Sequence, residues 1–286
     1  MLIDLQFHSL NSDGYLTPTD MAKHCNSRGI KVASLTDHNT VSGQEEFKRA
    51  CKQYNIKAIS GMELYVKLGS HHFNMLWYNF DIEHPDLHKI LRESQLRRRI
   101  CVRHALEKLQ AKNYLLDINE IIDKQNHYIP INKIIDSFYS SNKARISQEL
   151  GKKNILETEI IREYFRNTKH TRLHESYVDI SRIVKLKRII GGQLILAHPC
   201  KFRWVTEEVV QKLLAYGLDG LEVLTPHHNW EAISYLQAMA DRYKLIMTGG
   251  SDFHLFEEKE WYKIKSSWNY FYIESSLLAG IDRIIG

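Results

Sequence analysis

Histidine and carboxylate side chains follow several short apolar runs in this sequence, each at the point where the run ends. The runs LIDLQF, VASLT, AISGM, LILA and LIMTGGS have the composition of buried strands. The side chains that follow them, in chain order, are His8, Asp13, Asp37, His38, Glu63, His198, Asp252 and His254. Because the carboxyl ends of parallel strands meet at one rim of an α/β fold, we expect these groups to gather there. Imidazole together with carboxylate suits Mn, Zn or Fe, so the sequence predicts a metal centre.

The elements that must position this rim alternate along the chain. Short strand-like runs and helical runs follow one another up to residue 84, and the alternation returns after residue 190. Repeated βα units predict a parallel sheet in an α/β fold. Between these two parts, residues 85–190 show apolar side chains at helical spacing, with many charged residues among them. We therefore expect one domain from residues 1–84 and 191–286, interrupted by a helical insertion of residues 85–190.

The composition is that of an ordinary globular protein. The 286 residues include 43% hydrophobic and 26% charged side chains, with a net charge of +5. No apolar run approaches the roughly 20 residues that a membrane span needs, which predicts no membrane attachment. The four cysteines are scattered without a CxxC pair and the N-terminus does not resemble a signal peptide, so we expect reduced thiols in the cytoplasm. The small positive charge allows an anionic ligand, and nothing in the sequence indicates the oligomeric state.

Five segments together carry a family resemblance: DLQFHSLNSDGYLTP, LTDHNTVSG, SGMEL, LAHP and TGGSDFH. In this order, from residue 2 to about residue 254, they resemble the PHP (polymerase and histidinol phosphatase) family. The resemblance implies a distorted (βα)7-type PHP barrel that holds up to three metal ions at its C-terminal rim, with the helical insertion capping that rim. The insertion, with IIGGQLILAHP and GLEVLTPHHNW, is similar to the subgroup of the bacterial 3′,5′-nucleoside bisphosphate phosphatases and the related 5′-to-3′ exoribonuclease. The resemblance to these enzymes implies hydrolytic removal of phosphates or nucleotides, usually with manganese.

The resemblance also implies three sets of metal ligands. The first set is position 6, His8, Glu63 and Asp252. The second set is Glu63, a histidine after the GMEL strand, and His198. The third set, which is complete in this sequence, is Asp13, His38 and His254. We therefore expect one to three divalent ions per chain, with manganese first and zinc or iron as the alternatives.

Two positions depart from the family pattern, and both carry amides. Gln6 stands where the first set has a histidine, and Asn74 stands where the second set does. An amide oxygen coordinates transition metals more weakly than imidazole, so we expect Gln6 and Asn74 to be weak ligands at most. His72 lies two residues before Asn74, on the same face of a strand, and is a candidate substitute. These departures put full metal occupancy, and with it hydrolysis, in question.

Basic residues are the candidates for binding a substrate phosphate. Arg145, in NKARISQEL, is similar to an arginine that faces the phosphate in the subgroup. The further candidates are Arg98, within a run of three arginines, and Lys201, two residues after the LAHP motif. Arginine forks match phosphate oxygens in geometry and charge. For the arginine run, a solvated helix face is the alternative interpretation.

The sequence thus favours a metal-dependent phosphoesterase of the phosphatase or exonuclease type. The expected substrate is a small phosphorylated molecule, a nucleotide or short oligonucleotide, hydrolysed by metal-activated water. Glu63 would bridge two ions, and His198 or His254 would protonate the leaving oxygen. The alternative is a catalytically impaired module that binds a nucleotide or phosphate ligand, because two usual histidine ligands are replaced. A histidinol-phosphate phosphatase is a third and less favoured interpretation.

Overall fold

The chain divides into two compact units in a computed structural model that describes residues 1–125, 127–254 and 271–286. The sheet unit comprises residues 1–90 and 177–286, and the helical unit comprises residues 91–176. The sheet unit therefore takes in two short stretches, 85–90 and 177–190, that the sequence interpretation placed in the insertion. That the insertion caps a rim stays a prediction.

The strands of the sheet unit form two sheets among the described residues. A four-stranded sheet has the order β10-β1-β2-β3, and a six-stranded sheet has the order β6-β4-β5-β7-β8-β9. The first sheet consists of β1 (Leu2–Asp4), β2 (Val32–Ala33), β3 (Lys57–Ala58) and β10 (Ile273–Glu274). The second consists of β4 (Gly61–Leu68), β5 (His71–Tyr78), β6 (Val178–Asp179), β7 (Gln193–Leu196), β8 (Gly220–Leu224) and β9 (Ile246–Gly249). Most neighbours are parallel, as predicted, but β5 runs antiparallel to both β4 and β7, and β10 to β1.

The two sheets are joined by two isolated bridges. One parallel bridge links Phe7 to Phe253, and another links His38 to Glu63. The predicted α/β class is confirmed. The described strands do not close into one continuous barrel, because these single bridges stand where a closed barrel would have paired strands. The contacts nevertheless bring the strand ends that carry the predicted ligands together.

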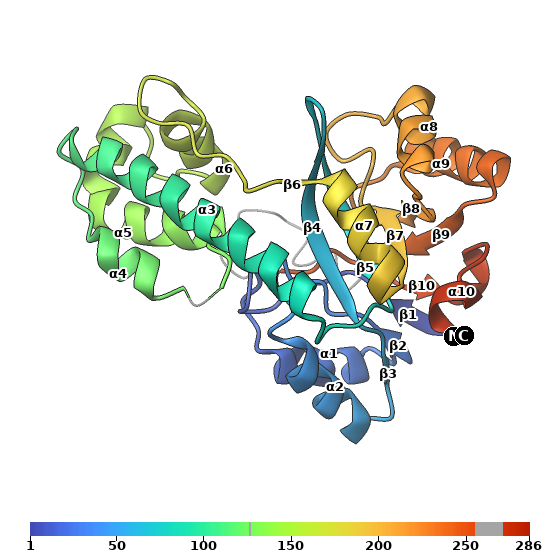
Figure 1. The fold of residues 1–286 in the computed structure, drawn as a ribbon. Coiled ribbons are helices and arrows are strands. Elements are labelled where there is room, and N and C mark those ends of the chain that lie inside the picture. Colours follow the sequence, from blue (N-terminus) through green and yellow to red (C-terminus); the bar gives the residue numbers. More distant parts are fainter. Residues whose placement is uncertain (126, 255–270) are drawn as a thin grey trace. The chain divides into compact units, whose positions relative to one another are not determined.

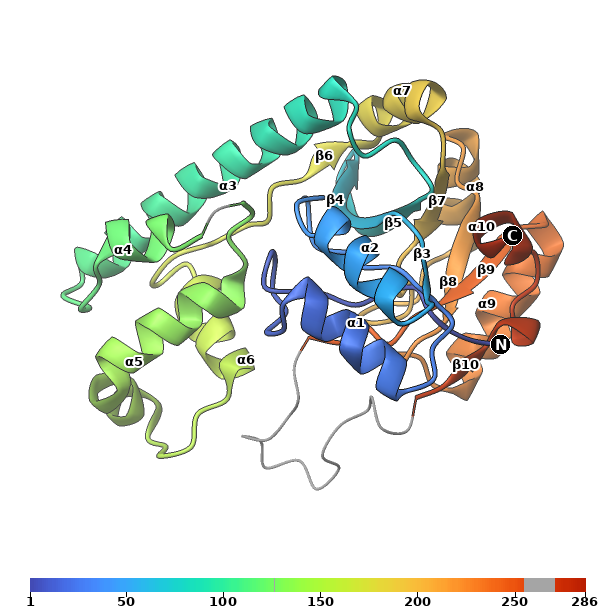
Figure 2. The same cartoon turned by 90° about the horizontal axis from the view of Figure 1, so that it is seen from below.

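Helices surround the sheets of the sheet unit (Figures 1 and 2). They are α1 (Pro18–Ser27), α2 (Gln44–Gln53), α7 (Ile180–Ile190), α8 (Glu207–Ala215), α9 (Trp230–Tyr243), α10 (Asp282–Ile285) and a 3-10 turn (Ser275–Leu277). Helix α1 begins with Thr17, whose side chain accepts a hydrogen bond from the Asp20 N–H, followed by a proline in the first turn. Its buried face, which includes Met21 and Cys25, packs with Phe7 and Phe47 in one hydrophobic cluster. Phe7 is thus anchored, and it precedes His8 directly.

The helical unit has a hydrophobic core of its own. Helix α3 (Pro85–Gln110) enters it from the sheet unit, and α4 (Ile118–Asp123), α5 (Ile131–Leu150), α6 (Glu157–Ile160) and a π-helical turn (Ile161–Phe165) complete its helices. Leu106, Phe138 and Tyr164 lie fully buried at the centre of this core. Among the described residues, no helix combines the length and apolar character that a membrane span would need.

Candidate metal centre

Glycine allows the ends of β1 and β9 to approach each other closely. A Cβ atom added to Gly250 would lie 2.4 Å from the Cβ atom of Gln6, which no side chain could occupy without displacing the backbone. Just beyond this approach, the Asp252 N–H donates to the Gln6 carbonyl at 2.9 Å. The loop after β9 thereby brings Asp252 beside His8.

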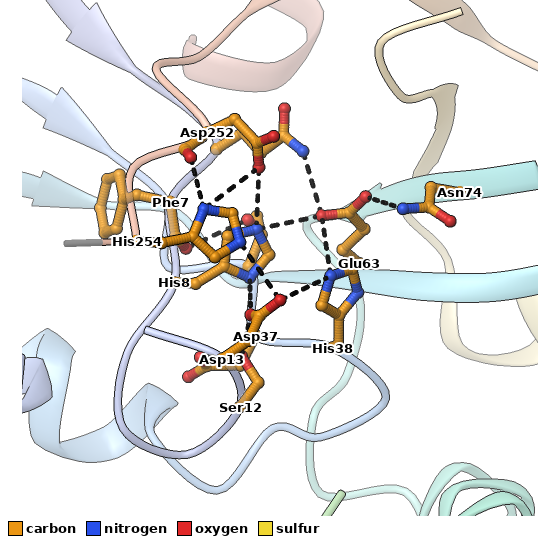
Figure 3. Close-up of polar contacts among 12 residues, drawn as sticks. Phe7, His8, Ser12, Asp13, Asp37, His38, Glu63, Asn74, Asp252 and His254 are labelled. Atoms are coloured by element: carbon orange, nitrogen blue, oxygen red, sulfur yellow. Dashed lines mark hydrogen bonds and ion pairs between the residues drawn. The ribbon is translucent and has the colours of Figure 1, made fainter. Parts of the chain in front are cut away.

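His8 lies at the centre of the site and is completely buried (Figure 3). Its Nε2 atom is 3.1 Å from Glu63 Oε2 and 3.2 Å from Asp252 Oδ1. Its Nδ1 atom faces the other way and is 3.4 Å from Asp13 Oδ1. One imidazole therefore contacts carboxylates on both sides, and each ring nitrogen belongs to a different group of donors.

The first group consists of His8, Asp13, His38 and His254. Asp13 Oδ2 lies 3.2 Å from His254 Nε2 and 3.5 Å from His38 Nε2. The imidazole of His8 stacks on those of His254 and His38, with ring centroids 4.3 and 4.7 Å apart. One donor atom from each of the four residues lies within 4.8 Å of all the others. The three ligands predicted as the complete third set are thus brought together, and His8 joins them.

The second group is arranged around the carboxylate of Glu63. Donor atoms of His8, Glu63 and Asp252 also lie within 4.8 Å of one another. Glu63 Oε2 faces His8, while its other oxygen, Oε1, lies 3.1 Å from His198 Nε2. The two oxygens of Glu63 therefore point to different neighbours, which is the orientation that a bridging carboxylate needs.

The two amides that replace family histidines both contact Glu63. Gln6 Nε2 donates to Glu63 Oε2 at 3.0 Å, and Asn74 Nδ2 donates to Oε1 at 2.7 Å (Figure 3). Gln6 is completely buried, and Asn74 is partly buried. Both side chains thus still face the site, as predicted. In the orientation seen here they present amide hydrogens to Glu63, whereas a metal ion would need their oxygens.

The three carboxyl groups of the site are held in their ionised form. Burial by itself would raise the pKa of Asp13, Glu63 and Asp252, because it disfavours the charged state. Neighbouring basic groups outweigh burial and lower the pKa of all three, with Lys201 the largest such contributor at Asp252. The site therefore concentrates negative charge away from water.

The histidines respond to this charge in different ways. Burial would lower the pKa of His8 and His254, but the Asp13 carboxylate and its neighbours outweigh it and raise both. At His38 burial prevails and lowers the pKa. The raised pKa of His8 and His254 means that protons compete more strongly with a metal ion for these two rings.

The donor set fits a divalent metal ion. It combines imidazole nitrogen with carboxylate oxygen, the mixture that suits Mn, Fe and Zn. One buried oxygen, Oε1 of Gln6, accepts no hydrogen bond among the described residues. Buried polar atoms nearly always have a partner, so this atom marks a position that a bound ligand would complete. The residues thus support the predicted dependence on divalent ions.

Two residues of the site have a backbone conformation that is unfavourable for a side chain. His198 has a φ of 28° and Asp252 a φ of 51°, both in the left-handed region that favours glycine. Such conformations cost roughly 1–3 kcal/mol each and persist only where the surroundings enforce them. At His198 the backbone N–H donates to the buried Glu222 carboxylate at 2.7 Å, which holds the residue in place.

Two further residues contribute to the site: His227, which the sequence analysis did not select as a ligand, and Asp37, which it placed at the rim without a role. His227 Nε2 lies 2.6 Å from Asp252 Oδ2, and Asp37 accepts hydrogen bonds from Ser9 and Ser12 in the loop that carries Asp13. Both follow strands in the sequence, which was the available signal. His227 follows β8, in the TPHH segment, and Asp37 stands directly before His38.

The predicted basic residues occupy very different environments. Lys201 lies in the site, with Nζ 2.8 Å from Asp252 Oδ2. Arg98 belongs to the helical unit and is completely buried, where it donates to the carbonyls of Ile129 and His174 and pairs with Glu175. These contacts favour a structural function for Arg98 over phosphate binding.

Arg145 and His72 are also engaged by neighbours in their own units. The guanidinium of Arg145 lies over the Tyr114 ring at 3.7 Å, pairs with Glu149 and donates to two backbone carbonyls. His72 stacks on Tyr177 with ring centroids 4.1 Å apart. Phosphate binding by Arg145 and metal binding by His72 stay predictions.

Comparisons with known proteins agree with this geometry. The profile of the PHP domain matches residues 4–167, which is more than half of the chain. A 5′-3′ exoribonuclease of Haemophilus influenzae is 26% identical over 88% of this chain and 89% of its own length. A 3′,5′-nucleoside bisphosphate phosphatase of Chromobacterium violaceum is 28% identical over 88% of this chain and 87% of its own.

Solved structures show the same fold. A Bifidobacterium adolescentis protein assigned to the metal-dependent phosphoesterases superposes with a TM-score of 0.76 at 19% identity, covering 92% of this chain and 91% of its own. An amidohydrolase of Chromobacterium violaceum, with bound sulfate and no metal, superposes with a TM-score of 0.71 at 23% identity. The superposition covers 88% of this chain and 87% of the amidohydrolase. The chain therefore belongs to the PHP domain family, and with it to the phosphoester-cleaving hydrolases, as its motifs predicted.

Proposed function

We propose that this chain is a metal-dependent phosphoesterase that hydrolyses a phosphate ester of a nucleotide or short oligonucleotide. The observation that carries the proposal is the position of Glu63. Its two carboxylate oxygens contact His8 on one side and His198 on the other, within a buried group of ionised carboxylates. The relatives named for action on nucleotide or RNA phosphates support the substrate class.

The proposed metal ligands are His8, Asp13, His38, Glu63, His198, Asp252 and His254, with Gln6 and Asn74 as weak ligands. We propose manganese as the resident ion on the resemblance to the subgroup, and the mixed imidazole and carboxylate donors are compatible with it. A bound divalent ion would supply a charge that polarises the phosphoryl oxygen and lowers the pKa of water.

The protein's own groups have separate tasks in this proposal. Lys201 remains charged, because the Asp252 carboxylate outweighs burial and raises its pKa, and it would bind a phosphate oxygen at the rim. His254 uses both ring nitrogens, Nε2 towards Asp13 and Nδ1 towards the Asp252 carbonyl. The ring of His198 contacts Glu63 through Nε2, and we propose that His198 delivers a proton to the leaving oxygen in the state in which its ring is protonated and not bound to an ion.

The first test is elemental analysis of protein purified with manganese, followed by hydrolysis assays. The assays use adenosine 3′,5′-bisphosphate and a short 5′-phosphorylated RNA, with Asp13→Asn as the inactive control. We expect at least two ions per chain and release of phosphate or nucleotide well above the control. One ion or fewer, with no release, would instead support the catalytically impaired binding module.

A further inference from the structure

A cavity of about 600 Å³ opens beside the candidate metal centre, within the sheet unit. Its walls come from the start of β5, from Tyr177 and from the loop between β7 and α8. Asn74 and His198 belong to this lining, and both contact Glu63 Oε1, at 2.7 and 3.1 Å. A phosphoester cleaved at Glu63 would therefore have room for its organic part in this cavity, whose volume lies in the usual range for small-molecule sites.

The lining is unusually aromatic and unusually exposed. Phe202 is 86% exposed and Trp204 47% exposed, although water contact with large apolar side chains is unfavourable. His72 and Tyr177, which also belong to the lining, form a stacked pair. A lining with several aromatic rings suits a flat ligand, because aromatic faces stack on other π systems.

The charge of the lining selects among phosphate esters. Among the described residues that line the cavity there is no carboxylate, while Arg203 and several histidines are present. Such a wall does not suit an ammonium group, as an amino-alcohol phosphate would carry. It does suit a neutral heteroaromatic ring, with arginine and imidazole available to its nitrogen and oxygen atoms.

We propose that this cavity binds the nucleobase of the substrate, with Phe202 and Trp204 as the stacking residues. The proposal rests on the proposed function and narrows it to base-bearing esters. Removing one stacking residue weakens base binding by roughly 5- to 150-fold where such contacts have been measured in other proteins. The affinity should therefore decrease for esters that carry a base and stay unchanged for esters that lack one.

The test compares Trp204→Ala, Phe202→Ala and the control Trp230→Ala with the wild type, each loaded with manganese. Trp230 is 78% exposed on α9 and lies outside the cavity lining. Substrates are adenosine 3′,5′-bisphosphate and the corresponding abasic bisphosphate, with hydrogen in place of the base. We expect KM for the base-bearing ester to rise at least about fivefold in both cavity variants with kcat retained. The abasic ester and the control should show wild-type values.

A second readout does not depend on hydrolysis. Equilibrium dialysis measures binding of adenosine, which has no phosphate, and both cavity variants should lose it while Trp230→Ala keeps it. If the wild type cleaves neither ester, the proposed function is wrong. The adenosine binding of the wild type and the variants then shows by itself whether the cavity binds a nucleobase. Equal KM changes for both esters, or adenosine binding that the cavity variants retain, would overturn the proposal.

Discussion

Both units of this protein bury charged side chains, but they do so in opposite ways. In the helical unit, the guanidinium of Arg98 is completely buried, yet it has one carboxylate partner, Glu175, and two backbone carbonyls as acceptors. In the sheet unit, Asp13, Glu63 and Asp252 converge on His8, and each has its pKa lowered.

The difference indicates what each cluster is for. The Arg98 cluster balances one cation with one anion inside the protein, so its charges stabilise the fold without a ligand. The Glu63 cluster combines several ionised carboxylates with histidines that bind metals only when deprotonated. We infer that the Arg98 cluster serves the fold, whereas the Glu63 cluster, whose histidines can release their protons, serves a bound cation.

The largest expected effect is loss of metal binding in Asp13→Asn. Asp13 contacts His38 and His254 directly, and an amide cannot replace its charge. We expect the affinity for Mn²⁺ at this group to fall by at least about 100-fold, more than the loss seen for outer residues of metal sites. Isothermal titration calorimetry measures it, with the exposed Asp241→Asn on α9 as the matched control. If Asp13→Asn bound Mn²⁺ as tightly as the wild type, the assignment of a metal-binding role to this cluster would be wrong.

Arg98→Met should act on stability instead. It leaves the Glu175 carboxylate without its cation and the carbonyls of Ile129 and His174 without this donor, so we expect a loss of about 3 kcal/mol in the free energy of unfolding. Urea denaturation measures the change. Arg99→Met, next along the helix, removes a partly exposed pair with Asp123 at 3.4 Å and should cost less than about 1 kcal/mol. Equal effects of the two variants would show that burial of Arg98 matters little.

The two clusters should also differ in their response to pH. His8 and His254 have a pKa raised above the ordinary 6.5 because adjacent carboxylates outweigh burial, so their protons compete with a metal ion at neutral pH. We expect Mn²⁺ affinity to rise about tenfold per pH unit while one of these histidines deprotonates, and to level off once both have done so.

The stability of the ion-free protein should change in the opposite direction. A raised pKa stabilises the fold below pH 6.5, where the histidines are charged in both states, and this contribution is lost as pH rises through the raised values. The Arg98 cluster should show no such dependence, since guanidinium keeps its proton. Unfolding and Mn²⁺ titrations between pH 6 and 9 measure both trends. A flat affinity profile would contradict the assignment of His8 and His254 as ligands.

The smallest expected effect comes from Gln6→His. The imidazole would restore a strong donor beside Glu63 in place of an amide of similar size. We expect occupancy of a second ion to increase, with an affinity gain of up to about tenfold. Metal content after dialysis against limiting Mn²⁺ measures it, and Gln193→His at the start of β7 is the control. A gain in the control of the same size would mean that the added histidine binds metal nonspecifically.

The sequence by itself determined which residues could bind metal and on which kind of fold. His8, Asp13, His38, His198, Asp252 and His254 follow strand-like runs, and the carboxyl ends of parallel strands meet at one rim. Glu63 was expected directly after the run AISGM, but it lies within β4. It also identified Gln6 and Asn74 as departures that still face the site. The α/β class followed from the alternation of strands and helices.

Only the tertiary structure decided how these groups are used. Arg98 and Lys201 are both cations in polar stretches of sequence, yet one lies among backbone carbonyls of a helical core and the other against Asp252. The direction of the Gln6 and Asn74 amides, and the contact of His227 with Asp252, depend in the same way on packing between distant segments. Burial and charge balance arise from contacts across tens to hundreds of residues, and no local pattern records them.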